Sequence, residues 1–221
     1  MINIMKNNKA LVILSGGQDS TTSLGWALKN FDAVEALTFD YGQRHRRELD
    51  CAIKVAELFK VKHRIVTIDS FSQLTSNAMM SEKLIETNQE SGLPSTFVPG
   101  RNLIFVTFAA AYAYERKIAN LVLGVSMVDY SGYPDCREET MKSLEKTISL
   151  GMDFSFKLHT PLIHLDKKQT VLLAKELGIL DTLKYTHTCY IGANPPCGSC
   201  PACILRAKGF SGAGVKDPLL N

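Results

Sequence analysis

The 221-residue sequence contains no run that approaches the ~18 consecutive apolar residues needed to span a membrane. Its first segment, MINIMKNNKALVILSGG, has only a short apolar run and no small-residue cleavage site, so it is more typical of a first strand than of a signal peptide. Hydrophobic residues make up 45% and charged residues 21% of the chain, the balance of an ordinary globular protein. We therefore expect a cytoplasmic protein without a membrane partner.

The chain also lacks a strong excess of charge of either sign. Its formal net charge is +3 with every thiol counted as neutral, and any ionised cysteine would lower it further. The C-terminal segment adds only Arg206, Lys208 and Lys216 as basic residues beyond its cysteines. Bulk charge therefore gives no reason to expect a nucleic-acid partner.

No internal repeat or low-complexity segment interrupts the chain, and strand-like and helix-like segments alternate along it. The apolar spacing predicts strands at 9–15, 33–41, 61–70, 118–126 and 154–160. It predicts helices at 21–31, 45–60, 103–117, 137–150 and 167–177, the last opening at the capping residue Asp166 and closing at Gly178. The helix at 103–117 is almost wholly apolar, which predicts burial on several sides.

This alternation predicts an α/β fold with a mostly parallel sheet and right-handed crossovers. Ligands of such sheets bind beyond the carboxyl ends of the strands. The composition shifts once, near residue 185, where cysteine, glycine and proline become frequent. We therefore expect one main domain over residues 1–184 and a small C-terminal segment, 185–221, packed on it. The polar, glycine- and proline-containing residues 70–100 indicate a long loop. The sequence does not decide whether this loop forms a lid over the site.

The stretch SGGQDSTTS, residues 15–23, follows the first predicted strand and is richer in glycine and hydroxyl groups than a turn requires. Gly16 and Gly17 carry no Cβ, so they allow positive φ and a close approach to a ligand. The next helix presents its unpaired N–H groups to the same place. Asp19 beside a phosphate would repel it unless Mg²⁺ lies between them. The stretch therefore predicts a nucleotide-phosphate site, and a strand-to-helix turn capped by Ser20 is the alternative.

Neither a Walker loop, which needs Gly-Lys-Ser/Thr, nor the dinucleotide motif G-x-G-x-x-G is present here. SGGQDS instead resembles the S-G-G-x-D-S signature of the PP-loop ATP pyrophosphatases. The resemblance implies a doubly wound, Rossmann-like parallel sheet, with ATP and magnesium as co-substrate and cleavage between the α- and β-phosphates. It implies that the nucleotide is contacted by Leu14, Ser15, Gly16, Gly17, Gln18, Asp19, Ser20, Thr21, Thr22, Ser23, Leu24, Thr38 and Tyr41.

Four of the six cysteines lie within fifteen residues of one another, with the spacing C-x7-C-x2-C-x2-C over Cys189, Cys197, Cys200 and Cys203. Each C-x2-C pair brings two thiolates onto one cation, and four thiolates complete a tetrahedral zinc site. An iron–sulfur cluster also takes four thiolates, but its usual run ends in Cys-Pro, whereas the fourth ligand here lies upstream. We therefore expect one structural zinc ion per chain and a plain buried thiol at Cys136.

Further motifs resemble the 7-cyano-7-deazaguanine synthase family: FVPGRN at 97–102, GYPDCR at 132–137, HTPL at 159–162 and CGSCPAC at 197–203. The resemblance covers residues 10–209. It implies a ligase of queuosine biosynthesis that converts 7-carboxy-7-deazaguanine and ammonia to 7-cyano-7-deazaguanine at the expense of two ATP, through an adenylated carboxylate and then an adenylated amide. The apolar helix at 103–117 favours a homodimer.

The same resemblance implies roles for individual residues. Asp19 and Ser20 would hold the departing pyrophosphate and its metal, and Lys167 would stabilise the charge of the transition state. Arg101 in the PGRN motif would clamp a phosphate through two parallel hydrogen bonds. For Lys167 the alternative is a solvated residue in the first turn of a helix, and for Arg101 it is a salt bridge that fixes the loop.

The GYPDCR motif supplies the residues expected to recognise the deazaguanine. Tyr133 would stack on the base, Asp135 would accept hydrogen bonds from its aminopyrimidine edge, and Arg137 would meet its carboxylate. The alternative is a structured turn. Arg46 and Arg47 belong to a basic cluster at a predicted helix start, which is usually a solvated face, so we leave them outside the site.

Two other functions are compatible with the glycine-rich loop. A PP-loop enzyme with a different acceptor, such as a tRNA thiolase or a lysidine-type ligase, would need a sulfur-carrying cysteine or a basic surface, and neither is evident. A nucleotide-sensing or zinc-stabilised interaction module would bind ATP without releasing AMP, but it leaves the PGRN and GYPDCR motifs unexplained.

Overall fold

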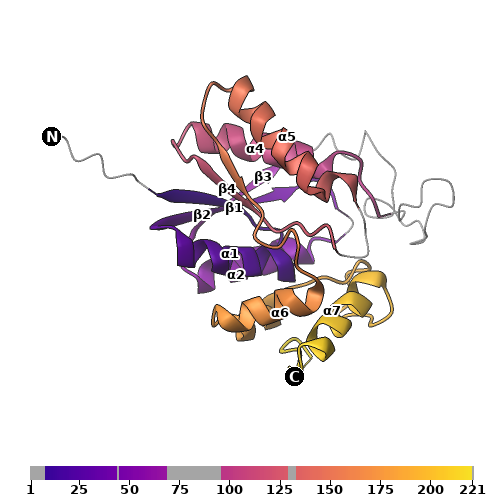
Figure 1. Ribbon diagram of the computed structural model, residues 1–221. Helices are drawn as coiled ribbons and strands as arrows, with labels where there is room; N and C mark the ends of the chain where they lie inside the picture. Colours follow the sequence, from indigo (N-terminus) through magenta and orange to yellow (C-terminus); the bar gives the residue numbers. More distant parts are fainter. Residues whose placement is uncertain (1–7, 44, 69–95, 129–132, 221) are drawn as a thin grey trace.

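The computed structural model describes residues 8–43, 45–68, 96–128 and 133–220, and it is built around one parallel sheet (Figure 1). The strands are β1 (Lys9–Ile13), β2 (Ala33–Asp40), β3 (Lys62–Thr67), β4 (Asn120–Leu123) and β5 (Lys157–His159). Their order is β3-β2-β1-β4-β5, and every neighbouring pair runs parallel. Most of the predicted loop at 70–100 lies outside the described residues.

Helices cover both faces of this sheet. In Figure 1, α1 (Gln18–Asn30) and α2 (Arg47–Leu58) lie on one face, and α4 (Arg101–Tyr114) and α5 (Glu138–Gly151) lie on the other. Two further helices, α6 (Lys167–Glu176) and α7 (Pro201–Gly212), follow on the α1 side, and short 3₁₀ turns are found at η1 (Pro134–Cys136) and η2 (Leu180–Tyr185). This arrangement confirms the predicted doubly wound α/β fold.

Successive residues of β1 explain why the strands are apolar on both sides. Ala10 and Val12 belong to the core beneath α1 and α2, whereas Leu11 and Ile13 belong to the core beneath α4 and α5. Side chains alternate across a strand, so a strand covered on both faces has a continuous apolar run. The strand that precedes the glycine-rich loop is therefore held rigidly from both sides.

The helix α4 departs from the prediction that it is buried on several sides. Phe105, Val106 and three of the four alanines pack into the core. Leu103, Phe108 and Tyr114, by contrast, are 37%, 47% and 45% exposed. The prediction is wrong for the single chain because only one face of α4 meets the sheet. The opposite face of the helix remains apolar and accessible in the described structure.

The predicted start and end of α6 are confirmed. The N–H of Gln169 donates to the carboxylate of Asp166 at 2.7 Å, and the N–H of Asp166 donates to the Gln169 side chain at 2.9 Å, which completes a capping box. Gly178 follows the helix with φ +72°. This fixed start determines where Lys167, the first residue of α6, projects.

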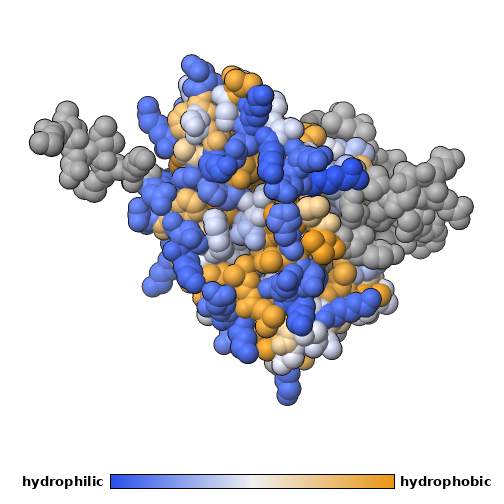
Figure 2. Space-filling view, viewed as in Figure 1, coloured by the Kyte–Doolittle hydropathy of each residue, from blue (hydrophilic) through white to orange (hydrophobic). Residues whose placement is uncertain are grey.

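The C-terminal helix α7 packs against α6. Val171 and Ala174 of α6 share a core cluster with Phe210 of α7. A Cβ on Gly209 would lie 2.9 Å from the Cβ of Lys167, so α7 passes closely over the first turn of α6. The face in Figure 2 is mostly hydrophilic, with smaller apolar areas over α1 and α6. Within the described ranges, no helix is long and apolar enough to cross a membrane.

Candidate active site

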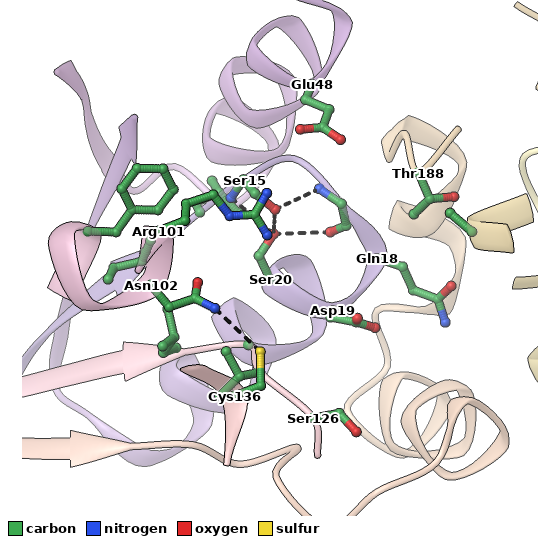
Figure 3. Close-up of a pocket in the computed structure, with 18 of the residues that line it drawn as sticks. Ser15, Gln18, Asp19, Ser20, Glu48, Arg101, Asn102, Ser126, Cys136 and Thr188 are labelled. Atoms are coloured by element: carbon green, nitrogen blue, oxygen red, sulfur yellow. Dashed lines mark hydrogen bonds between the residues drawn. The ribbon is translucent and has the colours of Figure 1, made fainter. Parts of the chain in front are cut away.

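A cavity of about 270 Å³ opens beyond the carboxyl ends of β1 and β4 (Figure 3). These two strands are neighbours in the sheet although they are far apart in sequence, so the chain reverses its winding direction between them. Open α/β sheets bind their ligands at this kind of switch point. The cavity therefore lies where the strand order alone places a ligand.

The glycine-rich loop forms one wall of the cavity, and its conformation depends on Gly16. This residue has φ +84°, and a Cβ added to it would overlap the carbonyl oxygen of Glu48 and lie 2.8 Å from the backbone nitrogen of Ala52. Gly17 has φ −83° and is the N-cap of α1. Only Gly16 uses the positive φ that glycine allows, and a Cβ on Gly17 would lie 3.6 Å from the carbonyl oxygen of His187, an ordinary van der Waals contact.

Two serine hydroxyls fix the shape of the loop. The N–H of Ser15 donates to Ser20 Oγ at 3.1 Å, and the two hydroxyl oxygens lie 3.0 Å apart. Ser20 Oγ also donates to the carbonyl of Gly17 at 3.1 Å. Gly17 itself is the N-cap and no side chain caps α1, so the alternative of a turn capped by Ser20 is wrong. The first N–H groups of α1 remain available to an anion in the cavity.

Replacing Gly16 and Gly17 separately by alanine tests this account of the loop. We expect Gly16→Ala to lower the free energy of unfolding by about 3–5 kcal/mol, because positive φ and overlap with α2 both oppose a Cβ. Gly17→Ala should cost only about 1 kcal/mol, the effect of alanine at an N-cap. Urea unfolding of the two variants measures the difference. Equal losses would contradict the geometry described for the loop.

Asp19 and Lys167 meet across the cavity from two helices. Lys167 Nζ donates to Asp19 Oδ2 at 2.5 Å, and both side chains are mostly buried. The other oxygen, Asp19 Oδ1, is buried and has no hydrogen-bond partner within the described chain. Gln18, only 1% exposed, likewise has an amide without partners among the described residues. Buried polar groups without partners are rare, so this first turn of α1 is suited to a polar or ionic ligand.

Arg101 brings a second positive charge to the cavity from the start of α4. Its Nη1 donates to the hydroxyl of Tyr41 at 3.3 Å, and it forms no ion pair with any residue that the structure describes. Burial by itself would lower the pKa of Arg101, but the neighbouring Tyr41 and Tyr133 raise it, so the guanidinium stays charged. An unpaired arginine at a helix N-terminus favours an anion in front of it.

Glu48 is a carboxylate on the cavity wall that the sequence analysis missed. It lies in the first turn of α2, and Figure 3 shows it projecting from that helix toward the loop of Ser15. Burial raises the pKa of Glu48 to about 7, and Arg101 opposes this shift. The position could have been found from sequence, because the helix that follows β2 begins at the same edge of the sheet as the loop.

The inner wall of the cavity is apolar and aromatic. Phe39 and Phe105 stack with their ring centroids 4.6 Å apart, and Tyr41 lies 5.2 Å from Phe105. Tyr133 contributes another ring, whose hydroxyl is 2.7 Å from Thr96 Oγ1. Flat apolar walls of this kind suit planar heterocycles, while the charged groups lie at the loop end.

The structure brings most of the predicted site residues together. The predicted residues on the cavity wall are Leu14, Ser15, Gly17, Gln18, Asp19, Ser20, Tyr41, Arg101, Tyr133 and Lys167. Those away from the wall are Gly16, Thr21, Thr22, Ser23, Leu24, Thr38, Asp135 and Arg137. The wall also contains residues that the sequence analysis did not assign to the site, among them Gln43, Glu48, Asn102, Cys136, His187, Thr188, Tyr190 and Arg206.

Three of the predicted site residues lie away from the cavity wall. Thr38 Oγ1 donates to the carbonyl of Leu14 at 2.5 Å, so it fixes the end of β1 from behind the loop. The carboxylate of Asp135 accepts from the N–H of Asn102 at 3.0 Å, at the start of α4. Arg137 is exposed at the start of α5. Their contacts with ATP or substrate remain predictions.

The four clustered cysteines converge at the end of the chain. The Sγ atoms of Cys189, Cys197, Cys200 and Cys203 all lie within 4.8 Å of one another, and those of Cys197 and Cys203 are 3.9 Å apart. A tetrahedral zinc site with Zn–S bonds of about 2.3 Å places its sulfur atoms roughly 3.8 Å apart. None of the six cysteines, all of which the structure describes, forms a disulfide. The four residues therefore fit a single metal ion.

The segment before Cys189 links this cluster to the glycine-rich loop. The N–H of His187 donates to the carbonyl of Gly16 at 3.0 Å. Arg206 of α7, which is buried, donates to Asp217 at 2.6 Å and to Thr186 Oγ1 at 2.8 Å. The cysteine-bearing segment thus supports one side of the cavity as well as closing the chain.

Comparison with known proteins identifies the family. A family model described as Queuosine biosynthesis protein QueC matches residues 9–214. The 7-cyano-7-deazaguanine synthase of Chromobacterium violaceum is 55% identical over 225 residues, which cover 100% of this chain and 96% of that protein. The protein of the same name from Laribacter hongkongensis is 55% identical over 215 residues, covering 96% and 94%. The chain belongs to the QueC family.

Membership of the QueC family confirms the resemblance carried by the motifs of the sequence. The fold also agrees with a solved structure, a 4-thiouridine synthetase–RNA complex with bound ATP, at a TM-score of 0.56 and 18% identity. That match covers 94% of this chain and 50% of the other chain, and at this identity it shows the fold alone. The shared fold is the doubly wound parallel sheet that the resemblance of SGGQDS implies.

Proposed function

We propose that the chain is a ligase of queuosine biosynthesis that converts 7-carboxy-7-deazaguanine and ammonia into 7-cyano-7-deazaguanine at the expense of two ATP. The observation that carries the proposal is the 55% identity to a 7-cyano-7-deazaguanine synthase along the whole chain. The cavity supports it, because it combines an anion-binding loop with an aromatic wall. The small net charge of +3 agrees with a free base as substrate and not a nucleic acid.

In the proposed reaction a carboxylate oxygen of the substrate attacks the α-phosphorus of ATP, and pyrophosphate leaves. Ammonia then displaces AMP to give an amide, whose oxygen is adenylated in turn, and loss of the second AMP leaves the nitrile. The loop N–H groups with Ser15 and Ser20 hold the departing pyrophosphate. Lys167 and Arg101 face it with positive charge, so the protein acts mainly by positioning and by charge stabilisation.

The aromatic residues Tyr41 and Tyr133 would flank the two heterocycles. Magnesium, when bound, would neutralise charge on the phosphates, and Asp19 would hold it through the buried oxygen Oδ1 that lacks a protein partner. Asp135 and Arg137 stay candidates for substrate contact from the GYPDCR motif, although neither lies on the cavity wall. Thr38, which also lies away from the cavity wall, stays a candidate for contact with the adenosine of ATP.

Several finer features belong to the same proposal. The ion of the cysteine cluster is zinc, one per chain, and residues 185–221 form a zinc-binding segment on the nucleotide-binding domain 1–184. We place the protein in the cytoplasm, where cysteines stay reduced, and none of the six cysteines forms a disulfide. The exposed apolar face of α4, with Leu103, Phe108 and Tyr114, would be covered in a homodimer. Sedimentation of the purified protein distinguishes monomer from dimer.

The reaction is tested by incubating the protein with Mg-ATP, ammonium and 7-carboxy-7-deazaguanine and following nucleotides and base by chromatography and mass spectrometry. We expect two AMP for each nitrile formed. Release of ADP would contradict the PP-loop chemistry. AMP release that does not depend on the deazaguanine would point to another acceptor, and no turnover in folded protein would favour a binding module.

A further inference from the structure

Glu48 has no role in the steps proposed above, yet it lies on the wall of the reaction cavity. Its own backbone carbonyl is in contact with the position where Gly16 would carry a Cβ, so the first turn of α2 is pressed directly against the loop. Its carboxylate forms no hydrogen bond or ion pair with any of the described residues. It therefore faces the cavity at the loop end and is available to a ligand.

The proposed reaction brings in a co-substrate that needs such a group. At neutral pH ammonia is present almost entirely as ammonium, which has no lone pair on nitrogen and cannot attack an acyl adenylate. A cavity that uses it must bind a cation and remove one proton. Among the groups on the cavity wall, Lys167, Arg101 and Arg206 are cations, and Asp19 is engaged by Lys167.

We propose that Glu48 is the residue that binds ammonium in the cavity and accepts its proton before the attack on the adenylated carboxylate. This inference rests on the proposed function. Its pKa of about 7, raised by burial, agrees with the role, because the carboxyl group can then both accept and release a proton near neutral pH. Glu48 is thus a catalytic residue for the nitrogen-transfer step alone.

Atoms and charge are conserved in the nitrogen-transfer step. Ammonium gives one proton to the Glu48 carboxylate, which becomes a carboxylic acid, and ammonia is left with its lone pair. The nitrogen forms a bond to the acyl carbon, the bond between that carbon and the AMP oxygen breaks, and its electron pair leaves with AMP. The second proton passes from the adduct nitrogen to water, and Glu48 returns its own proton to solvent.

Three groups interact electrostatically with Glu48 from the surrounding elements. Arg101, at the start of α4, lowers its pKa, while Tyr41 after β2 and Cys51 on α2 both have raised pKa values to which Glu48 contributes. The pKa of Cys51 reaches about 11, so that thiol stays protonated near neutral pH, as does Tyr41. Glu48 and Arg101 therefore set the charge at this end of the cavity.

The test compares two nucleophiles in Glu48→Gln, which keeps the shape of the side chain and removes its charge. Hydroxylamine, unlike ammonia, is largely unprotonated at neutral pH and needs no base before attack. We expect the variant to lose about 10²–10⁴-fold in kcat/KM for ammonium. Hydroxamate formation from hydroxylamine should stay within a few-fold of wild type, and so should substrate-dependent exchange of labelled pyrophosphate into ATP.

The matched control is Asp50→Asn, which removes an exposed carboxylate from the same first turn of α2 and should leave every assay unchanged. Glu48→Asp, which keeps the carboxylate, should retain part of the ammonium activity. Equal loss with both nucleophiles, or full ammonium activity in Glu48→Gln, would overturn the role. Absence of pyrophosphate exchange in the wild-type protein would instead refute the proposed function, so the two failures are distinguishable.

Discussion

Replacing Lys167 with alanine should lower kcat for AMP formation by about 10²–10³-fold, the effect of removing one preorganised charge from a transition state. Its ammonium group lies 2.5 Å from Asp19 Oδ2 beside the loop that would hold pyrophosphate. Substrate binding relies on other groups as well, so KM should change much less than kcat. Steady-state kinetics with Mg-ATP and 7-carboxy-7-deazaguanine separate the two parameters.

Lys168 provides the matched control for this variant. It is the next residue on α6, carries the same charge and is exposed, so Lys168→Ala removes a lysine without reaching the cavity. We expect near wild-type kinetics from it. Equal effects of the two substitutions would mean that Lys167 acts through general electrostatics or through the packing of α6 on α7, and the role assigned here would be refuted.

The position of Lys167 also shows what the sequence can and cannot predict. The capping box at Asp166 and the close of the helix at Gly178 follow local rules, so the start of α6 was predictable to the residue. The contact of Lys167 with Asp19 joins residues 148 positions apart, and no local pattern indicates it. It follows only from how α6 packs beside α1.

The sheet also separates features that follow from local sequence patterns from those that depend on tertiary packing. Alternating apolar segments predict a parallel sheet and place the loop at its carboxyl edge, and both are confirmed. Glu48 was not predicted to be a site residue because its helix begins at the basic residues Arg46 and Arg47, which are typical of a solvated face. In the structure Arg46, the N-cap of α2, is indeed exposed and pairs with Asp40, while Glu48 in the first turn of the helix lies on the cavity wall.

The apolar composition of α4 predicted more burial than the structure shows. For Asp135, membership of a motif did not decide whether its carboxylate contacts a ligand or the protein. A run as apolar as the one in α4 predicts burial all round, but only its inner face meets the sheet, and Leu103, Phe108 and Tyr114 are exposed in the described structure. Asp135 is a motif residue whose carboxylate is used at the start of α4. Residue type predicts chemistry, and the contacts of each group decide whether that chemistry is available to a ligand.

Removing the metal from the cysteine cluster should have an effect on the nucleotide site as well as on stability. Structural zinc contributes ~10–16 kcal/mol of apparent binding free energy in small peptides, so its loss here should lower Tm by roughly 10 °C or more. His187, two residues before Cys189, connects the cluster to the glycine-rich loop, because its N–H donates a hydrogen bond to the carbonyl of Gly16 at 3.0 Å. Thr188 and Tyr190 of the same segment lie on the cavity wall, so we expect its unfolding to free this carbonyl and to open that side of the wall.

The measurement is calorimetric binding of a non-cleavable α,β-methylene ATP analogue, together with thermal unfolding, before and after treatment with a chelator, and in Cys200→Ser. Metal content by mass spectrometry and the absence of visible absorption would identify zinc and exclude an iron–sulfur cluster. Cys51→Ala, which removes a thiol outside the cluster, is the control and should keep both the metal and the affinity.

We expect chelation and Cys200→Ser to weaken analogue binding at least tenfold at temperatures where the sheet stays folded, since the loop then loses the support of His187 while β1 and α1 remain in place. Unchanged affinity after complete metal loss would show that the loop holds its shape without the cysteine segment.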